Sequence, residues 1–332
     1  MTQVREAGVL AMILIEKGDS MKNKLLILFI FLLSFSLHAE KYAAEFLTTG
    51  IGARALAMGG AFVAVANDAS AAYWNPAGLL QLQQRELHFM HASRFSDMVQ
   101  TDVFNIVVPG EKIAFGLNYL RMGIDDIPYT AKLDLNGRPV IEKYISDTEE
   151  ALFLSFGAQL HKKISLGGNL KVLRQKVGDN VSLGYGLDFG AFYCINPAFT
   201  FGAMMQDISG THIYWNTDSG HRDTKMPDLK YGLAYKKSFL FLRSHLLFSV
   251  QQNIRFEGKS YSSQLQLGDF ANSDFQFGGE YELMDMVALR LGANGSDLTA
   301  GAGLGFKMLR IDYAFMSYEL GNAHRVSASL RF

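Results

Sequence analysis

The sequence predicts an all-β fold: a transmembrane, antiparallel, up-and-down β-barrel of about 14 strands with a small N-terminal plug that contains short helices. Three observations predict this fold. An export leader precedes a glycine-studded stretch of small residues, β patterning then continues to the last residue, and the connections between predicted strands alternate between short and long. Together they describe a barrel that is occluded by its own N-terminal segment.

Composition narrows the class of protein. An aromatic content of 12%, with 32 glycines and 6 prolines, is typical of a β-rich domain. The 31 basic residues balance the 32 acidic ones, so the chain has no electrostatic footprint for nucleic acid. Its single cysteine, Cys194, cannot form an intramolecular disulfide. Partners are therefore expected to be lipidic, small or proteinaceous.

Residues 21–39 have the three parts of a signal peptide. Met21 to Lys24 form a basic start, residues 25–37 an apolar core, and Ala39 a small residue for cleavage. We expect the mature chain to begin at Glu40, and residues 1–20 to come from an upstream start codon chosen wrongly. A membrane anchor is disfavoured because the apolar run is shorter than the roughly 20 residues of a spanning helix.

Residues 40–85 are predicted to form the plug. Residues 50–79 read GIGARALAMGGAFVAVANDASAAYWNPAGL, and such small side chains let backbones approach closely inside a barrel. Asn67-Asp68 and Asn75-Pro76 are natural breakpoints, because Asn and Asp bond to nearby backbone and the residue before proline avoids the helical region. The run from Asn75 to Gly78 is expected to cap a short helix or to fix the passage into the first strand.

Residues 86–332 are predicted to form the barrel, in segments of alternating apolarity about as long as a tilted transmembrane strand. The predicted strands begin near residues 86, 98, 112, 151, 164, 184, 199, 228, 245, 274, 286, 298, 309 and 324.

The connections between these strands predict their orientation. Short links occur at Pro109-Gly110, Lys163, Asn196-Pro197, Ser238 to Arg243, Met284-Asp285 and Met308, and longer ones at 123–150, 208–227 and 257–273. Outer-membrane barrels have short periplasmic turns and longer external loops. Both ends of the barrel chain are therefore expected on the periplasmic side.

Period-two alternation assigns side chains to lipid or lumen. Leu152, Leu154, Phe156, Ala158 and Leu160 are expected to face lipid, and Ser155, Gly157, Gln159 and His161 the lumen. A water-soluble sandwich would alternate in the same way. The charged residues expected to line the lumen are Asp188, Glu280, Glu282, Arg290, Arg310 and Asp312.

Two roles are open for these charges. Arg290 and Arg310 have the chemistry to pair bidentately with the carboxylate of a ligand. The alternative is mutual ion pairing with Asp312, Glu280 and Asp188, since buried charges must be paired.

Apolar and polar residues alternate from Val326 to Phe332, so that the sequence ends in an aromatic residue. This ending resembles the signal by which barrel-assembly machinery recognises its clients, so Phe332 is the expected assembly signal. Tyr119, Tyr193 and Tyr318 fall near predicted strand ends, where aromatic girdles lie at membrane interfaces. These features favour a membrane barrel over a soluble sandwich.

Residues 50–79 and the barrel behind them resemble the outer-membrane PorV/PorQ group and, more distantly, the FadL long-chain fatty acid transporters. In FadL-type channels an N-P-A element belongs to a hatch beside which substrate leaves through a gap in the wall, and the resemblance carries this to Asn75, Pro76 and Ala77. Arg54 and Asp68 match charged positions of the PorV/PorQ pattern and imply luminal contacts; the alternative is that all five only hold the plug in place. The full hatch motif is Arg54, Gly59, Gly60, Asp68, Asn75, Pro76, Ala77 and Gly78.

Several apparent motifs are discounted. The glycines among residues 301–305 occur at every second position, which leaves one face of a strand without side chains. They are therefore not expected to form a nucleotide-binding loop. His88 and His91 point to opposite faces of a strand, which disfavours a metal site. No G-x-S-x-G element is present. The chain is therefore expected to be neither an enzyme nor a cofactor or metal binder, and an outer-membrane hydrolase would need a nonlocal triad.

The resemblance implies a monomeric outer-membrane channel for hydrophobic, fatty acid-like molecules, which would diffuse laterally past the hatch. Its expected partners are outer-membrane lipid, the ligand and the barrel-assembly machinery. The alternative is a PorV-like interaction or shuttle factor of a type IX-like secretion system, with secreted proteins as partners. An exposed apolar patch on residues 123–150 or 208–227 would favour this alternative.

Overall fold

Antiparallel strands account for most of the computed structural model, which describes residues 43–240, 243–256, 263–268, 271–318 and 321–332. The predictions for residues 1–39, the upstream start and the leader, lie outside the described residues, as does the beginning of the predicted plug at 40–42. The described residues belong to the unit Glu40–Phe332.

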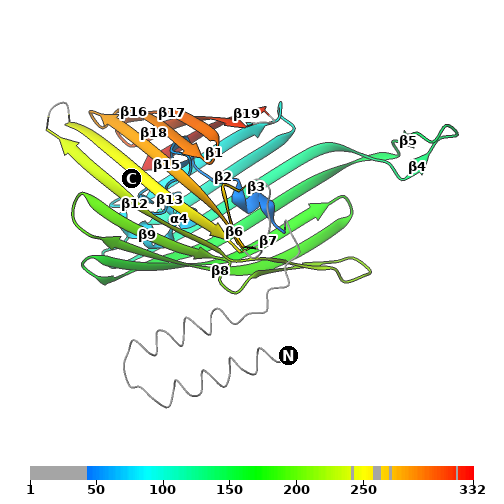
Figure 1. Ribbon diagram of the computed structural model, residues 1–332, viewed down its shortest axis with the longest axis horizontal. Coiled ribbons are helices and arrows are strands. Elements are labelled where there is room, and N and C mark those ends of the chain that lie inside the picture. The colour runs from blue at the N-terminus through cyan, green and yellow to red at the C-terminus, as the bar shows by residue number, and fades with distance from the viewer. Residues whose placement is uncertain (1–42, 241–242, 257–262, 269–270, 319–320) are drawn as a thin grey trace, which may run out of the picture. The chain divides into compact units, whose positions relative to one another are not determined.

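Fourteen long strands of the described chain close into a barrel, as predicted (Figure 1). Neighbours along the chain pair antiparallel, and β1 pairs with β19 from Glu86↔Arg331 to Arg94↔Ala323, which joins the two edges of the sheet. The strands are β1 Glu86–Arg94, β2 Val99–Val108, β3 Ile113–Tyr129, β6 Lys143–His161, β7 Ile164–Val177, β8 Asn180–Cys194, β9 Phe199–Gln206, β12 Asp228–Phe239, β13 Ser244–Arg255, β15 Ala271–Leu283, β16 Val287–Asn294, β17 Asp297–Phe306, β18 Leu309–Tyr318 and β19 Gly321–Arg331.

The expected loop 123–150 is wrong, because β3 and β6 run through most of it. They continue to pair from Ile127↔Ile145 to Tyr129↔Lys143 beyond a β-bulge. A small ladder of β4 (Lys132–Leu133) and β5 (Pro139–Val140) lies at the tip. Figure 1 shows this hairpin projecting well past the other strands. Cross-strand pairing extends both strands even where the sequence no longer alternates between apolar and polar.

The expected loop 208–227 also contains strands. β10 (Thr211–Trp215) pairs with β11 (Arg222–Lys225) and with the first part of β8, so β9 and β10 form one wall strand interrupted at residues 207–210. In the expected loop 257–273, β14 (Leu265–Leu267) pairs with β15, while 257–262 and 269–270 lie outside the described residues.

Glu86 and Arg331 face each other, so the barrel chain starts and ends at the same end, which we call the terminal end; the opposite end is the far end. The short links predicted at Pro109-Gly110, Lys163 and Met308 fall in the connections 109–112, 162–163 and 307–308, all of which lie at the terminal end. Links at the far end are not uniformly long, since β7–β8 and β16–β17 are joined by two residues each.

Alternation along β6 orders its side chains as predicted. Leu154 and Phe156 are about half exposed on the outer face, whereas Ser155 and Gly157 are buried on the inner face. Gln159 and His161, predicted to face inward, are exposed where the strand ends. The outer face thus carries the apolar belt that lipid requires.

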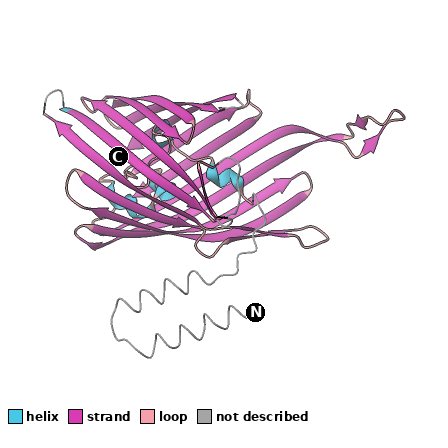
Figure 2. Ribbon diagram, viewed as in Figure 1, coloured by secondary structure: helices cyan, strands magenta, loops and turns pink. Residues whose placement is uncertain are grey.

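The segment before β1 folds into four short helical turns that lie within the barrel (Figure 2). They are η1 Glu45–Thr48, α3 Ala53–Ala57, α4 Ala71–Trp74 and η2 Pro76–Gln81, and we call residues 43–85 the plug. Nearly all plug side chains from Ile51 to Leu79 are buried. Within the described residues, no helix is long and apolar enough to cross a membrane.

Candidate functional site: the plug and two cavities

Glycines of the barrel wall make room for the plug. Gly157, Gly167 and Gly190 face one another across β6, β7 and β8. A β-carbon on Gly157 would lie 2.9 Å from the Pro76 carbonyl oxygen, and one on Gly167 or Gly190 would collide with the segment Asn75–Ala77. The plug backbone therefore rests directly on the backbone of the wall, which only glycine allows.

Asn75 fastens the plug at this contact. Its Oδ1 accepts a hydrogen bond from the Ala77 N–H at 3.2 Å, which caps η2. Its Nδ2 donates to the Val63 carbonyl within the plug at 2.9 Å and to the Ala191 carbonyl of β8 at 3.0 Å. Because Asn75 is fully buried, its side chain links the turn of the plug to the wall without help from solvent.

A second contact joins the plug to β13 and to β15–β17. Gly278 and Gly292 pair with each other and meet Met58 and Gly59 of the plug. The Gly59 N–H donates to Thr299 Oγ1 at 3.0 Å. Gly59 and Gly60 have φ values of 66° and 76°, a left-handed conformation that turns the chain after α3.

Arg54 heads a chain of buried ion pairs that we call the ion ladder. Its guanidinium bonds both oxygens of Glu280 on β15, each at 2.8 Å, and reaches Asp68 at 3.1 Å. Glu280 also pairs with Arg290 at 2.6 Å, and Arg290 with Asp312 at 2.8 Å. The ladder continues from Asp312 to Arg310 at 3.2 Å and from Arg310 to Glu282 at 2.5 Å.

The ion ladder lowers the pKa of a carboxyl group in the plug. Burial by itself would raise the pKa of the Asp68 carboxyl, but Arg54 and the Ser70 hydroxyl together lower it below its ordinary value. Of the two roles open for Arg290 and Arg310, mutual pairing is the one whose contacts are present. Both guanidinium groups already have carboxylate partners on the wall.

Asp188 lies in a separate buried cluster. Lys171 Nζ reaches Asp188 at 2.7 Å and Asp207 at 2.5 Å, and the Asp207 N–H donates to Asp188 at 2.9 Å. Asn169 bridges Asp188 and the Ala72 carbonyl of the plug. The cluster thus holds the interruption between β9 and β10. Sequence reasoning missed Asp207, because it was expected at the edge of a loop.

A cavity of about 860 Å³ lies on the far side of the plug. Leu56, Tyr73 and Trp74 of the plug and Phe153 of β6 form its apolar floor. The Lys230 ammonium lies 5.7 Å and 5.9 Å from the ring centroids of Tyr73 and Trp74, within the range of a cation–π interaction.

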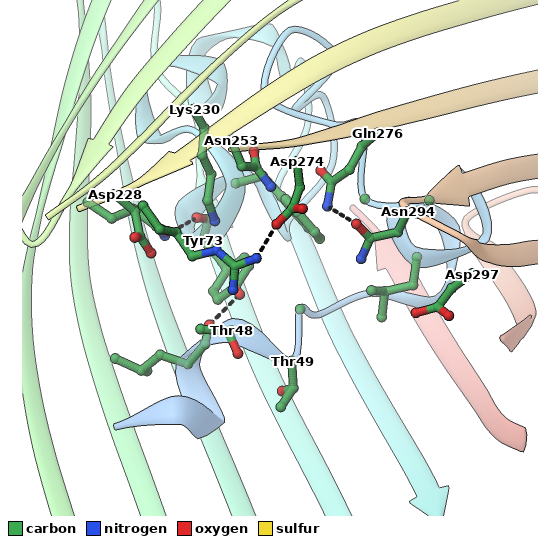
Figure 3. A pocket seen from close by; sticks show the side chains of 18 of the residues that line it. Thr48, Thr49, Tyr73, Asp228, Lys230, Asn253, Asp274, Gln276, Asn294 and Asp297 are labelled. Atoms are coloured by element: carbon green, nitrogen blue, oxygen red, sulfur yellow. Dashed lines mark hydrogen bonds and ion pairs between the residues drawn. The ribbon is translucent and has the colours of Figure 1, made fainter. Parts of the chain in front are cut away.

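The walls of this outer cavity are polar. Figure 3 shows Asp274 joined to Arg255, and the Gln276 amide donating to Asn294 Oδ1 at 3.0 Å. The side chains of Asp228 and Lys230 come from the same strand, β12. Sequence reasoning did not single out these wall residues, although the parity that places Glu280 inward also places Asp274 and Gln276 inward.

A second cavity, of about 460 Å³, lies at the terminal end and is lined by Arg54, Asn67, Gln81, Glu86 and Arg310 among others. Residues of the plug line both cavities. Phe332 is exposed at this end, where its N–H donates to the Arg85 carbonyl at 3.0 Å. In the described part of the chain, no group of three or more His, Cys, Asp or Glu side chains is placed to hold a metal.

Comparisons with known proteins agree with this architecture. A model described as an uncharacterised protein family, UPF0164, matches residues 36–182, which include the plug and the first strands. That description does not name the PorV/PorQ group. No curated protein matches the chain.

Solved structures with a similar fold are named as transporters or channels for hydrophobic compounds. The toluene transporter TbuX of Ralstonia pickettii has a TM-score of 0.57 at 15% identity over 85% of this chain and 98% of its own. The toluene transporter TodX of Pseudomonas putida has a TM-score of 0.59 at 13% identity over 85% and 99%. The monoaromatic hydrocarbon channel CymD has a TM-score of 0.59 at 14% identity over 85% and 98%.

Proposed function

We propose that this protein is an outer-membrane channel that binds a small molecule with a hydrophobic body in the outer cavity and passes it across the membrane. The observation that carries the proposal is the aromatic floor of that cavity, which the plug itself supplies through Tyr73 and Trp74. A ligand bound on this floor therefore contacts the plug, which either moves or lets the ligand pass beside it. The barrels with the same fold are named as transporters or channels for toluene and other monoaromatic hydrocarbons, which supports the same class of cargo here.

Uptake of radiolabelled toluene into cells that carry this protein and no other hydrophobic channel tests the proposal. We expect uptake to exceed that of cells without it. Trp74→Ala should lower the excess at least several-fold, because it removes the largest apolar surface of the floor. Trp215→Ala, which removes the chain's other tryptophan away from the cavity lining, is the control. Equal uptake with and without the protein would reject this cargo.

The route past the plug is proposed to run sideways, beside Asn75–Ala77, because the lumen is filled between the two cavities. Cysteines at Ala64 and Thr200 would fasten the plug to β9, since the Thr200 hydroxyl donates to the Ala64 carbonyl at 2.9 Å. Cys194, the cross-strand partner of Thr200, is replaced by Ala in this variant so that it cannot compete for the disulfide. We expect the disulfide to stop uptake and a reductant to restore it. Uptake that continues with the disulfide intact would mean that the plug does not move.

Occlusion has its own test in planar bilayers. A chain without residues 50–79 should conduct ions continuously, because it lacks most of the plug residues that line the two cavities. The complete chain should conduct little. Unchanged conductance of a folded, shortened barrel would contradict the role of the plug.

A second function, binding of a partner protein outside the membrane, is favoured by the tip of the β3–β6 hairpin. Apolar side chains there are exposed rather than packed; they are Leu133, Leu135, Val140, Ile141 and Tyr144. A patch of this kind at the end of a projecting arm is typical of an interaction site. Replacing residues 132–140 by a short glycine turn should abolish co-purification of a secreted protein without affecting toluene uptake. If no protein co-purifies with the complete chain, this second function is rejected.

A further inference from the structure

Two arginines on the inner wall lack the carboxylate partners that the other luminal arginines have. Arg94 ends β1 and lines the outer cavity, and Arg325 on β19 is 2% exposed. In the register of the barrel seam, Arg94 pairs with Ala323 and Arg325 with Ala92. The two guanidinium groups are therefore diagonal neighbours on the inner face, each with a formal positive charge.

Among the described residues, neither arginine has a carboxylate oxygen within 4.0 Å. Arg94 Nη2 contacts Met122 Sδ at 3.1 Å, while its Nε has no hydrogen-bond partner. Arg325 has no hydrogen-bond partner for Nε or Nη1, and the side chain it does hydrogen-bond to is the uncharged Tyr318.

Neighbouring neutral groups are unsatisfied in the same place. Thr101 Oγ1, beside Ala92 on β2, and Ser327 Oγ, next along the inner face of β19, are both buried without a partner. Buried polar groups normally have hydrogen-bond partners, and a buried charge without one is costly. A guanidinium cannot escape this cost by losing its proton. The cluster is therefore built to receive acceptor atoms.

We propose that Arg94 and Arg325 form an oxyanion subsite of the outer cavity, which binds the carboxylate of an organic acid. This inference rests on the proposed function and specifies its cargo. Arg94 would contact the carboxylate from the cavity, and Arg325 would supply the second positive charge from behind it. The apolar part of the acid would lie on Phe153, Tyr73 and Trp74, which line the same cavity.

The proposal distinguishes this subsite from the ion ladder. Arg290 and Arg310 have the same side chain but already hold Asp312, Glu280 and Glu282. Arg290 Nη1 and Nη2 make no hydrogen bond either, but a ligand carboxylate that approached them would be repelled by the wall carboxylates Asp312 and Glu280 beside them. At Arg94 and Arg325 it would fill open donor positions, and charge-assisted hydrogen bonds to guanidinium groups are among the strong ones.

Ligand-observed NMR with benzoate and benzamide tests the subsite on the folded, complete protein in detergent. The two probes share ring and shape, but only benzoate is charged. We expect benzoate to bind at least tenfold more tightly than benzamide. Arg94→Gln and Arg325→Gln should each weaken benzoate binding about tenfold, the scale of one lost charge-assisted bond, and leave benzamide within twofold.

Matched variants make the result decisive. Arg94→Lys keeps the charge and should retain most of the benzoate preference, while Arg174→Gln removes an exposed cation that does not line the cavity and should change benzoate binding less than twofold. A large loss in Arg174→Gln with none in the Arg94 and Arg325 variants would overturn the assignment. So would equal affinity for the two probes, or binding of inorganic phosphate in place of benzoate. Failure of toluene uptake with benzoate binding intact would reject the neutral cargo and leave the subsite standing.

Discussion

Two parts of the inner wall carry the same kind of side chain in opposite states. Along β15–β18 the ion ladder gives every arginine a carboxylate, and through Arg54 it includes the plug. Across the β1–β19 seam, Arg94 and Arg325 have no carboxylate partner among the residues that the structure describes. The difference teaches that a luminal charge has two separable uses: a paired charge holds the structure together, and an unpaired one is available to a ligand.

The largest loss of stability is expected from Glu280→Gln, which breaks the ion ladder at its centre. The substitution leaves Arg54 and Arg290 each without their shared carboxylate, and breaking a buried ion pair typically costs about 3–5 kcal/mol. Urea titration in lipid vesicles measures the free energy of unfolding. A cost below about 1 kcal/mol would mean that the ladder contributes no more than a surface pair.

Arg54→Gln should come next, because it detaches the plug from the wall and leaves the wall pairs intact. Glu280 keeps Arg290, and Asp68 keeps Ser70. We expect a loss of about 1–3 kcal/mol, the cost of leaving a buried acceptor poorly satisfied, together with frequent openings in planar-bilayer recordings. Recordings as quiet as those of the unmodified protein would show that the glycine contacts alone keep the plug in place.

Arg325→Gln sharpens the comparison, because it is expected to change the free energy of unfolding in the opposite direction. Removing a buried charge that has no carboxylate partner among the described residues should leave the protein as stable as before or more stable by about 1 kcal/mol. The same urea titration without ligand measures the change. Destabilisation as large as that of Glu280→Gln would mean that Arg325 serves the fold, and the two parts of the wall would no longer differ.

The smallest effect is expected from Asp179→Asn in the far-end turn between β7 and β8. Asp179 pairs with Lys143 at 2.8 Å, but both side chains are open to solvent. Screening by water and salt makes such a pair worth little. The urea midpoint should not move measurably, which provides the reference for the three luminal variants; a clear shift would mean that the vesicle assay responds to charge in general.

The barrel could be predicted from the sequence because alternation is a local signal. The predicted starts at 86, 164, 199, 228 and 309 coincide with observed ones. The extension of β3 and β6 into the predicted loop could not be predicted in the same way, since it depends on pairing between two chain segments. The start predicted near 151 lies at Lys143 for that reason.

The site was predicted less completely, also for a physical reason. Parity places Glu280, Arg290 and Asp312 in the lumen, but which charge meets which depends on strand register. Register likewise makes Arg94 and Arg325 neighbours across a seam that joins the first strand to the last. The lack of a partner is a property of three-dimensional surroundings, so the sequence contains no signal for it.

The glycine contact between wall and plug has a consequence for sequence variation. At residues 157, 167 and 190 two backbones touch, and no side chain of any size fits between them. Phe156, one position away on the outer face, meets lipid and can be exchanged for other apolar residues. In related chains that keep the plug in this place, the three glycines should stay fixed while their outward neighbours drift, which would identify plugged barrels from sequence alone.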